Sequence, residues 1–276
     1  MKGINSKIYN KEYYLNHCLG FEEFKKYKGK KVHPRIVKFL SILKIVKGIN
    51  ILDVGCGRGD LSIECARKGA KVIGIDYSKD GINIANSSLK KQEVAIQRNV
   101  SFFRMDAKKL KFKDNYFDIV TSIDVFEHLY KDELEKTMHE ISRVLKSGGM
   151  LLVHTETNKI YLNFTHRIWS YPLDQALIKI NGLFNKKNYP GMPKDPRNAL
   201  HKIQHVNEPT YFYLKSLFQR HRFSGKIFPI VPMKPSLSWK DRLYNVFVSL
   251  FPISGSFPFH LFFAHDFICV MKNNKD

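Results

Sequence analysis

The stretch that decides the fold runs from Ile49 to Asp60 and reads Ile-Asn-Ile-Leu-Asp-Val-Gly-Cys-Gly-Arg-Gly-Asp. An apolar strand leads directly into three glycines at alternate positions, Gly55, Gly57 and Gly59. Glycine lets a strand turn sharply into a helix, and it lets a ligand approach the backbone because no side chain stands in the way. This junction predicts an α/β fold with a nucleotide-like ligand at the end of the first strand.

The spacing of these glycines distinguishes a dinucleotide-binding turn from other nucleotide-binding turns. A dinucleotide-binding turn has the pattern G-x-G-x-x-G, which would require a glycine at position 60. The chain has Asp60 there, and a carboxylate in the first turn of a helix repels a pyrophosphate, which prefers bare N–H groups. A dinucleotide-dependent oxidoreductase is therefore disfavoured.

Further apolar segments and helix signals follow in the order of a mostly parallel α/β sheet. A helix beginning at Pro34 is predicted before the first strand, over residues 34–47, and another is predicted from Lys131 to the glycine pair at 148–149. The predicted strands after the first are 71–76, 100–104, 117–123, 150–153, 222–230 and 260–271.

These motifs resemble, in sequence order, those of the class I S-adenosylmethionine-dependent methyltransferases. The segment Asp124-Val125-Phe126-Glu127-His128-Leu129 resembles that of the subgroup that includes the ubiquinone- and menaquinone-pathway methyltransferases (methyltransferase domain type 11). The resemblance implies a Rossmann-like, seven-stranded, mostly parallel sheet with an antiparallel last strand, helices on both faces and insertions on the substrate side.

The resemblance also implies S-adenosylmethionine as the cofactor. Asp76 ends the second strand, where a carboxylate accepts from both ribose hydroxyls, and Asp106 with the Ala107 amide is expected at the adenine. Each carboxylate has an alternative role as a cap of the following turn. The complete set of expected cofactor contacts is Asp53, Gly55, Cys56, Gly57, Gly59, Asp76, Tyr77, Asp106, Ala107, Ile123, Asp124 and Glu127.

Methyl transfer from a sulfonium is an in-line displacement in which the protein supplies alignment and, for an alcohol or phenol, a base. His128, after the fourth strand, is the first candidate for the base, and His154, after the fifth, is the second. A lone histidine is more often structural. His201 and His205 could reach the substrate or share one exposed helix face. No metal is expected, because the acids are assigned to the cofactor.

The chain of 276 residues is long enough for one α/β domain with insertions. We expect an N-terminal lid or helical extension over 1–48, the cofactor-binding core over 49–154, a substrate-side insertion over 155–206, and the rest of the sheet over 207–276 with an apolar insertion at 231–259. The cysteines Cys18, Cys56, Cys65 and Cys269 show neither zinc nor disulfide spacing, and no signal peptide is recognised, so a cytoplasmic location is expected.

The formal net charge is +21, which predicts attraction to an anionic lipid surface, an anionic substrate or nucleic acid, although scattered lysines are often only a solvated face. Residues 243–263 lack Asp, Glu, Lys and Arg. Their prolines argue against a membrane span, and we expect a broken apolar hairpin that either packs in the core or contacts a membrane or greasy substrate.

The sequence thus predicts methyl transfer to a small-molecule or lipid- or glycan-linked acceptor, at oxygen in preference to carbon or nitrogen. RNA or protein methylation is a second reading, although no RNA-binding module is recognisable. A non-catalytic S-adenosylmethionine-binding partner protein is a third. Neither the acceptor nor the oligomeric state can be read from the sequence.

Overall fold

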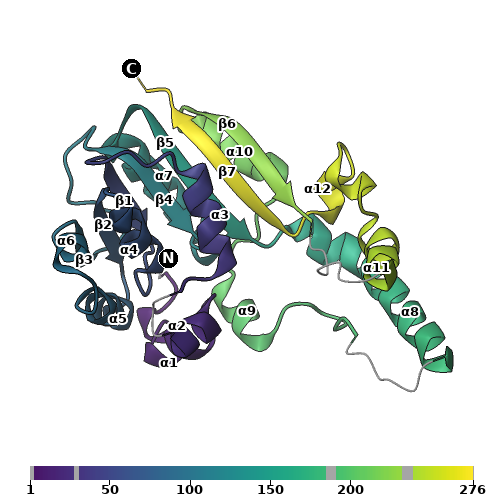
Figure 1. Ribbon diagram of the computed structural model, residues 1–276. Helices are drawn as coiled ribbons and strands as arrows, with labels where there is room; N and C mark the ends of the chain where they lie inside the picture. The colour runs from purple at the N-terminus through teal and green to yellow at the C-terminus, as the bar shows by residue number, and fades with distance from the viewer. Residues whose placement is uncertain (1–2, 28–30, 185–190, 232–238, 276) are drawn as a thin grey trace.

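The computed structural model describes residues 3–27, 31–184, 191–231 and 239–275, and its centre is a seven-stranded sheet in the order β3-β2-β1-β4-β5-β7-β6 (Figure 1). Within the described residues, β7 is the antiparallel strand, paired with β5 on one side and β6 on the other. The strands are β1 (Asn50–Val54), β2 (Lys71–Asp76), β3 (Val100–Arg104), β4 (Phe117–Ile123), β5 (Leu145–Glu156), β6 (Phe223–Ile230) and β7 (Asp266–Asn273). The predicted fold class is confirmed.

The strand limits predicted for the first half of the sheet agree with the structure, but β5 and β7 differ. β5 begins at Leu145, directly after the helix, and passes through the glycine pair that was expected to precede it. Gly148 has a φ of 73°, a conformation that glycine adopts without strain. β7 begins at Asp266, because residues 260–263 form a short helix in place of the first part of the expected strand.

Helices cover both faces of the sheet with separate apolar cores. One core includes Leu134, Met138 and Ile141 of α7 and Leu217 of α10, and the other includes Phe39 of α3. The expected helix over 34–47 is shorter in the structure and ends at Ile42. The helices of these layers are α3 (Pro34–Ile42), α4 (Asp60–Arg67), α5 (Lys79–Leu89), α6 (Val94–Gln97), α7 (Lys131–Val144) and α10 (Tyr211–Arg220).

Two insertions extend from the sheet beyond β5 and β7 as an elongated arm (Figure 1). We define the arm as residues 161–184 and 239–263. It comprises η3 (Tyr161–Ser170, a π-helix), α8 (Tyr171–Phe184), α11 (Trp239–Ser249), η4 (Ile253–Gly255) and α12 (His260–Phe263). The segment 243–263, expected as a broken apolar hairpin, consists of short helices separated by turns at 250–252 and 256–259. Residues 232–238 of the apolar insertion expected at 231–259 lie outside the described residues.

The N-terminal residues form short helices, η1 (Ser6–Ile8), α1 (Lys11–Asn16) and α2 (Phe21–Tyr27), beside the carboxyl ends of the central strands. The remaining short helices are η2 (Phe126–His128), after β4, and α9 (Ala199–Gln204), whose last residue contacts His128 of η2. Across the described residues, none of the helices has the length and apolar character needed to cross a membrane.

Candidate active site

The glycine-rich turn between β1 and α4 forms the floor of the site. Gly55, Gly57 and Gly59 have φ values of 73°, 51° and 79°, the left-handed region that favours glycine. A Cβ on Gly55 would lie 2.3 Å from Val125, and one on Gly59 would lie 2.5 Å from the Phe102 ring. The sequence therefore needs glycine here both for the turn and for close packing.

Asp76 is the carboxylate nearest to this turn. Its Oδ2 accepts from the Gly57 amide at 3.0 Å and from the Tyr14 hydroxyl at 3.3 Å, and its Oδ1 accepts from the Ser78 amide at 2.8 Å. Burial raises the pKa of Asp76 to about 6, although these donors act in the opposite direction. The Ser78 contact is the expected cap, and it leaves one Oδ1 lone pair for another donor.

Asp53 lies beneath the turn and connects three elements. It accepts from Ser62 of α4 at 2.6 Å and from Thr121 of β4 at 2.8 Å. Burial raises the pKa of Asp53 despite these two hydrogen bonds. Its carboxylate therefore holds α4 and β4 against β1 and fixes the position of the glycine turn.

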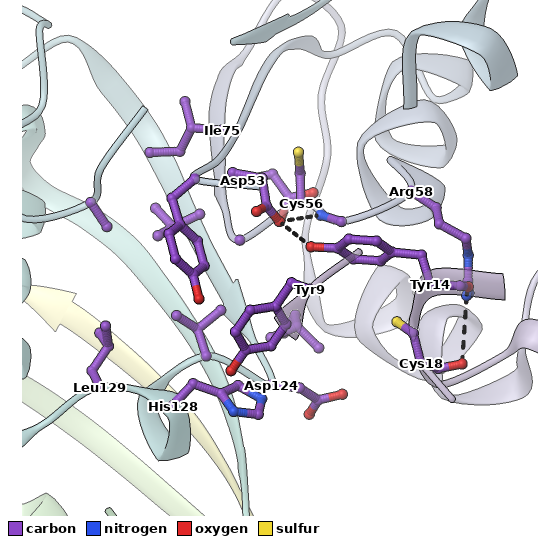
Figure 2. Close-up of a pocket in the computed structure, with 18 of the residues that line it drawn as sticks. Tyr9, Tyr14, Cys18, Asp53, Cys56, Arg58, Ile75, Asp124, His128 and Leu129 are labelled. Carbon is purple, nitrogen blue, oxygen red and sulfur yellow. Dashed lines mark hydrogen bonds between the residues drawn. The ribbon is translucent and has the colours of Figure 1, made fainter. Parts of the chain in front are cut away.

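A cavity of about 420 Å³ opens above the turn (Figure 2). Most of the residues expected to contact the cofactor line it together, whereas Gly59, Glu127 and His154 lie outside its lining. The expected contacts that line the cavity are Asp53, Gly55, Cys56, Gly57, Asp76, Tyr77, Asp106, Ala107, Ile123 and Asp124, and the candidate base His128 lines it too. These residues come from four separate segments of the chain: 53–57, 76–77, 106–107 and 123–128.

Asp106 lies at the cavity with most of its side chain exposed. It accepts from the Lys108 amide at 2.9 Å, as the capping alternative expected, and its Oδ2 lies 3.5 Å from Lys108 Nζ. Ala107 lines the same part of the cavity. Asp106 thus caps the following turn and also lines the cavity.

The N-terminal segment covers the cavity, and Arg58 fixes it there. The Arg58 guanidinium donates to the carbonyl of Tyr14 at 2.6 Å and to that of Leu19 at 2.5 Å, and it pairs with Asp60 at 2.8 Å. Tyr9 and Tyr14 project into the cavity from this segment (Figure 2). The sequence analysis missed this role of Arg58, because nothing in the glycine pattern signals contacts with residues so far away in the chain.

A buried network of charges lies at the carboxyl ends of β4 and β5 and at the amino end of β7, which runs antiparallel to β5. His154 Nδ1 is hydrogen-bonded to Asp124, and its Nε2 lies 3.7 Å from Asp266. Burial disfavours the imidazolium, but these carboxylates outweigh it and raise the pKa of His154 to about 10. Arg35 of α3 pairs with Glu156 at 2.9 Å and lies 3.5 Å from Asp124. The carboxylates thus favour the imidazolium form of His154 at neutral pH.

Glu127 is fully buried behind this network. Its carboxyl group accepts from the Thr155 hydroxyl at 2.9 Å and from the Glu156 amide at 3.3 Å. Burial and the neighbouring carboxylates Asp124 and Glu156 raise the pKa of Glu127 well above its ordinary value. Glu127 thus lies in the interior and does not line the cavity.

Three histidines meet beside the cavity mouth. The ring centres of His128 and His205 are 4.9 Å apart, and those of His201 and His205 are 3.6 Å apart. His128 Nδ1 lies 3.1 Å from the carbonyl oxygen of Gln204. A carbonyl only accepts, so Nδ1 carries the proton and Nε2 has the free lone pair. Burial lowers the pKa of His128 to about 4, so the ring is neutral at physiological pH.

Among the described residues, Glu127, His128 and His205 form a group whose potential ligand atoms lie within 4.8 Å of one another. Two imidazoles and a carboxylate are ligand types that transition metals accept. The Glu127 oxygens already accept from Thr155 and from the Glu156 amide. The Glu127 carboxyl group is thus engaged with β5 by hydrogen bonds from both Thr155 and the Glu156 amide.

The cavity fits the nucleoside of S-adenosylmethionine by the chemistry of its walls. The glycine turn leaves the backbone uncovered at one side, Asp76 offers a carboxylate acceptor at the end of β2, and Ile75, Met105 and Leu129 supply apolar surface. An acidic first turn of α4, with Asp60 paired to Arg58, does not offer a pyrophosphate site.

The chain is similar to known methyltransferases in sequence and in fold. Residues 51–149 match the methyltransferase domain family. A ubiquinone biosynthesis O-methyltransferase of Pelagibacter ubique is 35% identical over 127 residues, 45% of this chain and 50% of that protein. A sterol 4-C-methyltransferase of Caenorhabditis elegans is 32% identical, over 41% of this chain and 32% of that protein. The chain thus spans about half the length of the ubiquinone-pathway relatives that it matches.

Among solved structures, a geranyl diphosphate methyltransferase in complex with GPP and sinefungin has the same fold. It matches with a TM-score of 0.56 at 16% identity, over 87% of this chain and 77% of the other. The matched family segment spans β1 to the start of β5, which contains the glycine turn, Asp76 and Asp124. The chain therefore carries a methyltransferase domain of the class I, S-adenosylmethionine-dependent type.

Proposed function

We propose that the protein transfers a methyl group from S-adenosylmethionine to an oxygen atom of a small-molecule or lipid- or glycan-linked acceptor. The observation that carries this proposal is that one cavity combines the glycine turn, the Asp76 carboxylate and a neutral His128 at its mouth. The first two would hold the cofactor. The neutral His128 ring keeps a free Nε2 lone pair that can take the proton of an acceptor hydroxyl, as a weak base because burial lowers its pKa to about 4.

The cofactor would be held by residues of the central strands. Asp76 would accept from the ribose hydroxyls, Asp106 and the Ala107 amide would contact the adenine, and the turn at Gly55 to Gly59 would lie against the remainder. Cys56, Tyr77, Ile123 and Asp124 complete the proposed contacts. When bound, S-adenosylmethionine supplies an activated methyl group, so the protein need only align the acceptor and manage its proton.

His128 is the proposed base. Its Nδ1 proton is donated to the Gln204 carbonyl, which fixes the ring and directs the Nε2 lone pair away from that contact. Nε2 of His128 would take the hydroxyl proton as the acceptor oxygen gains the methyl group that the bound cofactor would supply, with the cofactor's sulfonium leaving as a neutral thioether. Asp124 favours the resulting imidazolium, because its carboxylate raises the pKa of His128 against the effect of burial.

His154 has a different proposed role. Its imidazolium is paired with Asp124 and Asp266, so it has no free lone pair with which to accept a proton at neutral pH. We therefore assign His154 to holding Asp124 at the cavity wall. Glu127 likewise acts from the interior, where its proposed contribution is to support the backbone of Glu156 and the loop after β4.

The acceptor class is proposed from the relatives and from the surface. Ubiquinone, sterol and geranyl diphosphate, named in those relatives, all carry extended apolar groups, and the cavity is mainly apolar between Met105, Ile36 and Phe39. The charge of +21 favours an anionic acceptor or an anionic membrane surface. A cytoplasmic location with peripheral contact at the inner membrane face belongs to the same proposal.

A methyl-transfer assay tests the proposal. The protein is incubated with S-adenosylmethionine labelled in the methyl group and with prenylated phenols, glycolipids, nucleotide sugars, RNA and a protein extract. Label in a hydroxyl-bearing lipid or sugar, lost in His128→Gln, supports the proposal. Label in RNA or protein supports the alternative readings, and cofactor binding without transfer to any acceptor supports a non-catalytic partner protein.

A further inference from the structure

The arm exposes an unusual amount of apolar surface. More than half of the large hydrophobic side chains that are exposed within the described residues belong to this arm, although it is a minor part of the chain. Phe257 is 77% exposed and Trp239 is 67% exposed. Contiguous exposed apolar surface on this scale marks an interaction site.

Helix α11 has its apolar side turned away from the protein. Trp239, Leu243, Val246 and Phe247 are exposed and recur at the spacing of one helix face. The side that faces η3 and α8 carries polar groups together with one apolar side chain: Asn245, Val248 and Ser249 are buried, and the Tyr244 hydroxyl donates to buried Asp174 at 2.6 Å. A surface helix in water normally shows the reverse arrangement, so this helix is built to have an apolar medium outside it.

The apolar face of α11 continues onto the neighbouring helices of the arm. Trp169 of η3 donates from its indole N–H to the Phe247 carbonyl at 3.0 Å. Phe164 of η3 lies with its ring 6.4 Å from that of Phe262 in α12. Because η3, α11 and α12 contribute to one connected surface, the exposed side chains can reach a flat partner together.

The charges around this surface are mainly positive. Arg167, Lys179, Lys240 and Arg242 are exposed on the arm, whereas Asp174 is buried and Asp241 of α11 is half-buried. Amphipathic helices with basic residues beside aromatic and leucine side chains lie in the interface of anionic membranes. A second copy of this chain would carry the same excess of positive charge, and long-range repulsion therefore opposes self-association.

We propose that the arm is the membrane-docking surface of this protein, and that α11 lies in the headgroup region of a bilayer that contains anionic phospholipid. The proposed function enters this inference only as the reason for docking: membrane binding would bring the cavity to an acceptor held in the membrane. Aromatic side chains anchor in the apolar boundary, and the adjacent lysines and arginines contact the anionic headgroups.

Vesicle sedimentation tests this directly with the full chain. The probes are vesicles of phosphatidylcholine alone and of phosphatidylcholine with phosphatidylglycerol. The test variant is Trp239→Ser with Leu243→Ser, at positions 67% and 46% exposed. The matched control is Val94→Ser with Phe103→Ser, at positions 62% and 46% exposed at the other end of the sheet (Figure 1). Since all four side chains are exposed, both variants should fold.

We expect the wild type and the control to bind the anionic vesicles, more weakly as salt rises, and the test variant to lose at least about tenfold in affinity. Equal binding by the two variants, or no binding by the wild type, would overturn the proposal. The proposal would also be overturned if light scattering showed that the wild type and the control form a stable dimer whereas the arm variant is a monomer. S-adenosylmethionine binding, measured in parallel and independent of the arm, separates failure of docking from failure of the proposed function.

Discussion

The Tyr14 hydroxyl donates to Oδ2 of Asp76 across 3.3 Å, so the N-terminal segment reaches the carboxylate proposed to bind the ribose. A carboxylate offers about four lone-pair sites. The amides of Ser78 and Gly57 and the Tyr14 hydroxyl use three of them. Two ribose hydroxyls cannot both donate to Asp76 unless Tyr14 withdraws, which makes this residue a competitor of the cofactor.

Tyr14→Phe should therefore bind S-adenosylmethionine more tightly than the wild type. The variant keeps the ring but removes the competing donor, and one hydrogen bond of this kind is worth about 1 kcal/mol, or about fivefold in affinity. Calorimetric titration measures the change. Weaker binding by Tyr14→Phe would mean that the hydroxyl acts together with the cofactor, contrary to this account.

Cofactor affinity should fall as the pH is lowered through about 6. The pKa of Asp76 is raised to about 6 by burial, and ribose hydroxyls donate only to its ionised form. Binding is thus complete above this pH and weakens below it, by up to about tenfold per pH unit for one proton. Asp76→Asn is the control: it should bind weakly and show a flat profile. A steep profile in that variant would assign the titration to another group.

His154→Gln should lower the free energy of unfolding, because His154 is proposed to hold Asp124 in place and not to take part in proton transfer. The variant leaves the buried carboxylates of Asp124 and Asp266 with less positive charge, and breaking a buried ion pair costs roughly 3–5 kcal/mol. Denaturant unfolding at neutral pH measures the loss. An unchanged unfolding free energy would show that Arg35 and His265, which also pair with these acids, neutralise them without His154.

The same network predicts how stability depends on pH. The pKa of His154 is raised from 6.5 to about 10 in the folded protein, since the carboxylates outweigh its burial. Its pairing therefore stabilises the fold fully below pH 6.5, and this contribution is lost as the pH rises through about 10. Melting curves of the wild type should show this decline, and His154→Gln should not.

His128→Gln should lower kcat by about 100-fold to 10,000-fold and leave cofactor affinity unchanged, because a general base contributes on that scale and the proposed cofactor contacts lie elsewhere. His139→Gln, at an exposed position on α7, is the matched control and should retain full activity. A loss of cofactor affinity equal to the loss in kcat would instead make His128 a binding residue.

The parts of the molecule that follow local rules could be predicted from the sequence. The strand-to-helix turn at Gly55 to Gly59 and the apolar strands β2, β3 and β4 depend on glycine conformations and short buried runs, and their limits were predicted within a residue or so. The resemblance to the methyltransferase family predicted that β7 is antiparallel. It did not predict that β7 begins at Asp266, because the mainly apolar residues 260–263 are compatible with either a buried strand or a helix.

The rest of the site depends on contacts between distant segments. The Arg58 contacts with the carbonyls of Tyr14 and Leu19, and the meeting of His128 with His205, arise only when the N-terminal helices and α9 pack at the cavity mouth. The pairing of His154 with Asp266 likewise requires β5 and β7 to be neighbours. For that reason the sequence could suggest His154 as a candidate base but could not show that neighbouring carboxylates favour its charged form.

The central claim is that this cavity binds S-adenosylmethionine through Asp76. Calorimetric titration of the purified protein with S-adenosylmethionine and, separately, with NAD, repeated on Asp76→Ala, tests it most directly. We predict binding of S-adenosylmethionine at one site, a large loss of that binding in the variant, and none of NAD to either protein. Binding of NAD, or equal binding of S-adenosylmethionine by the wild type and the variant, would contradict the account.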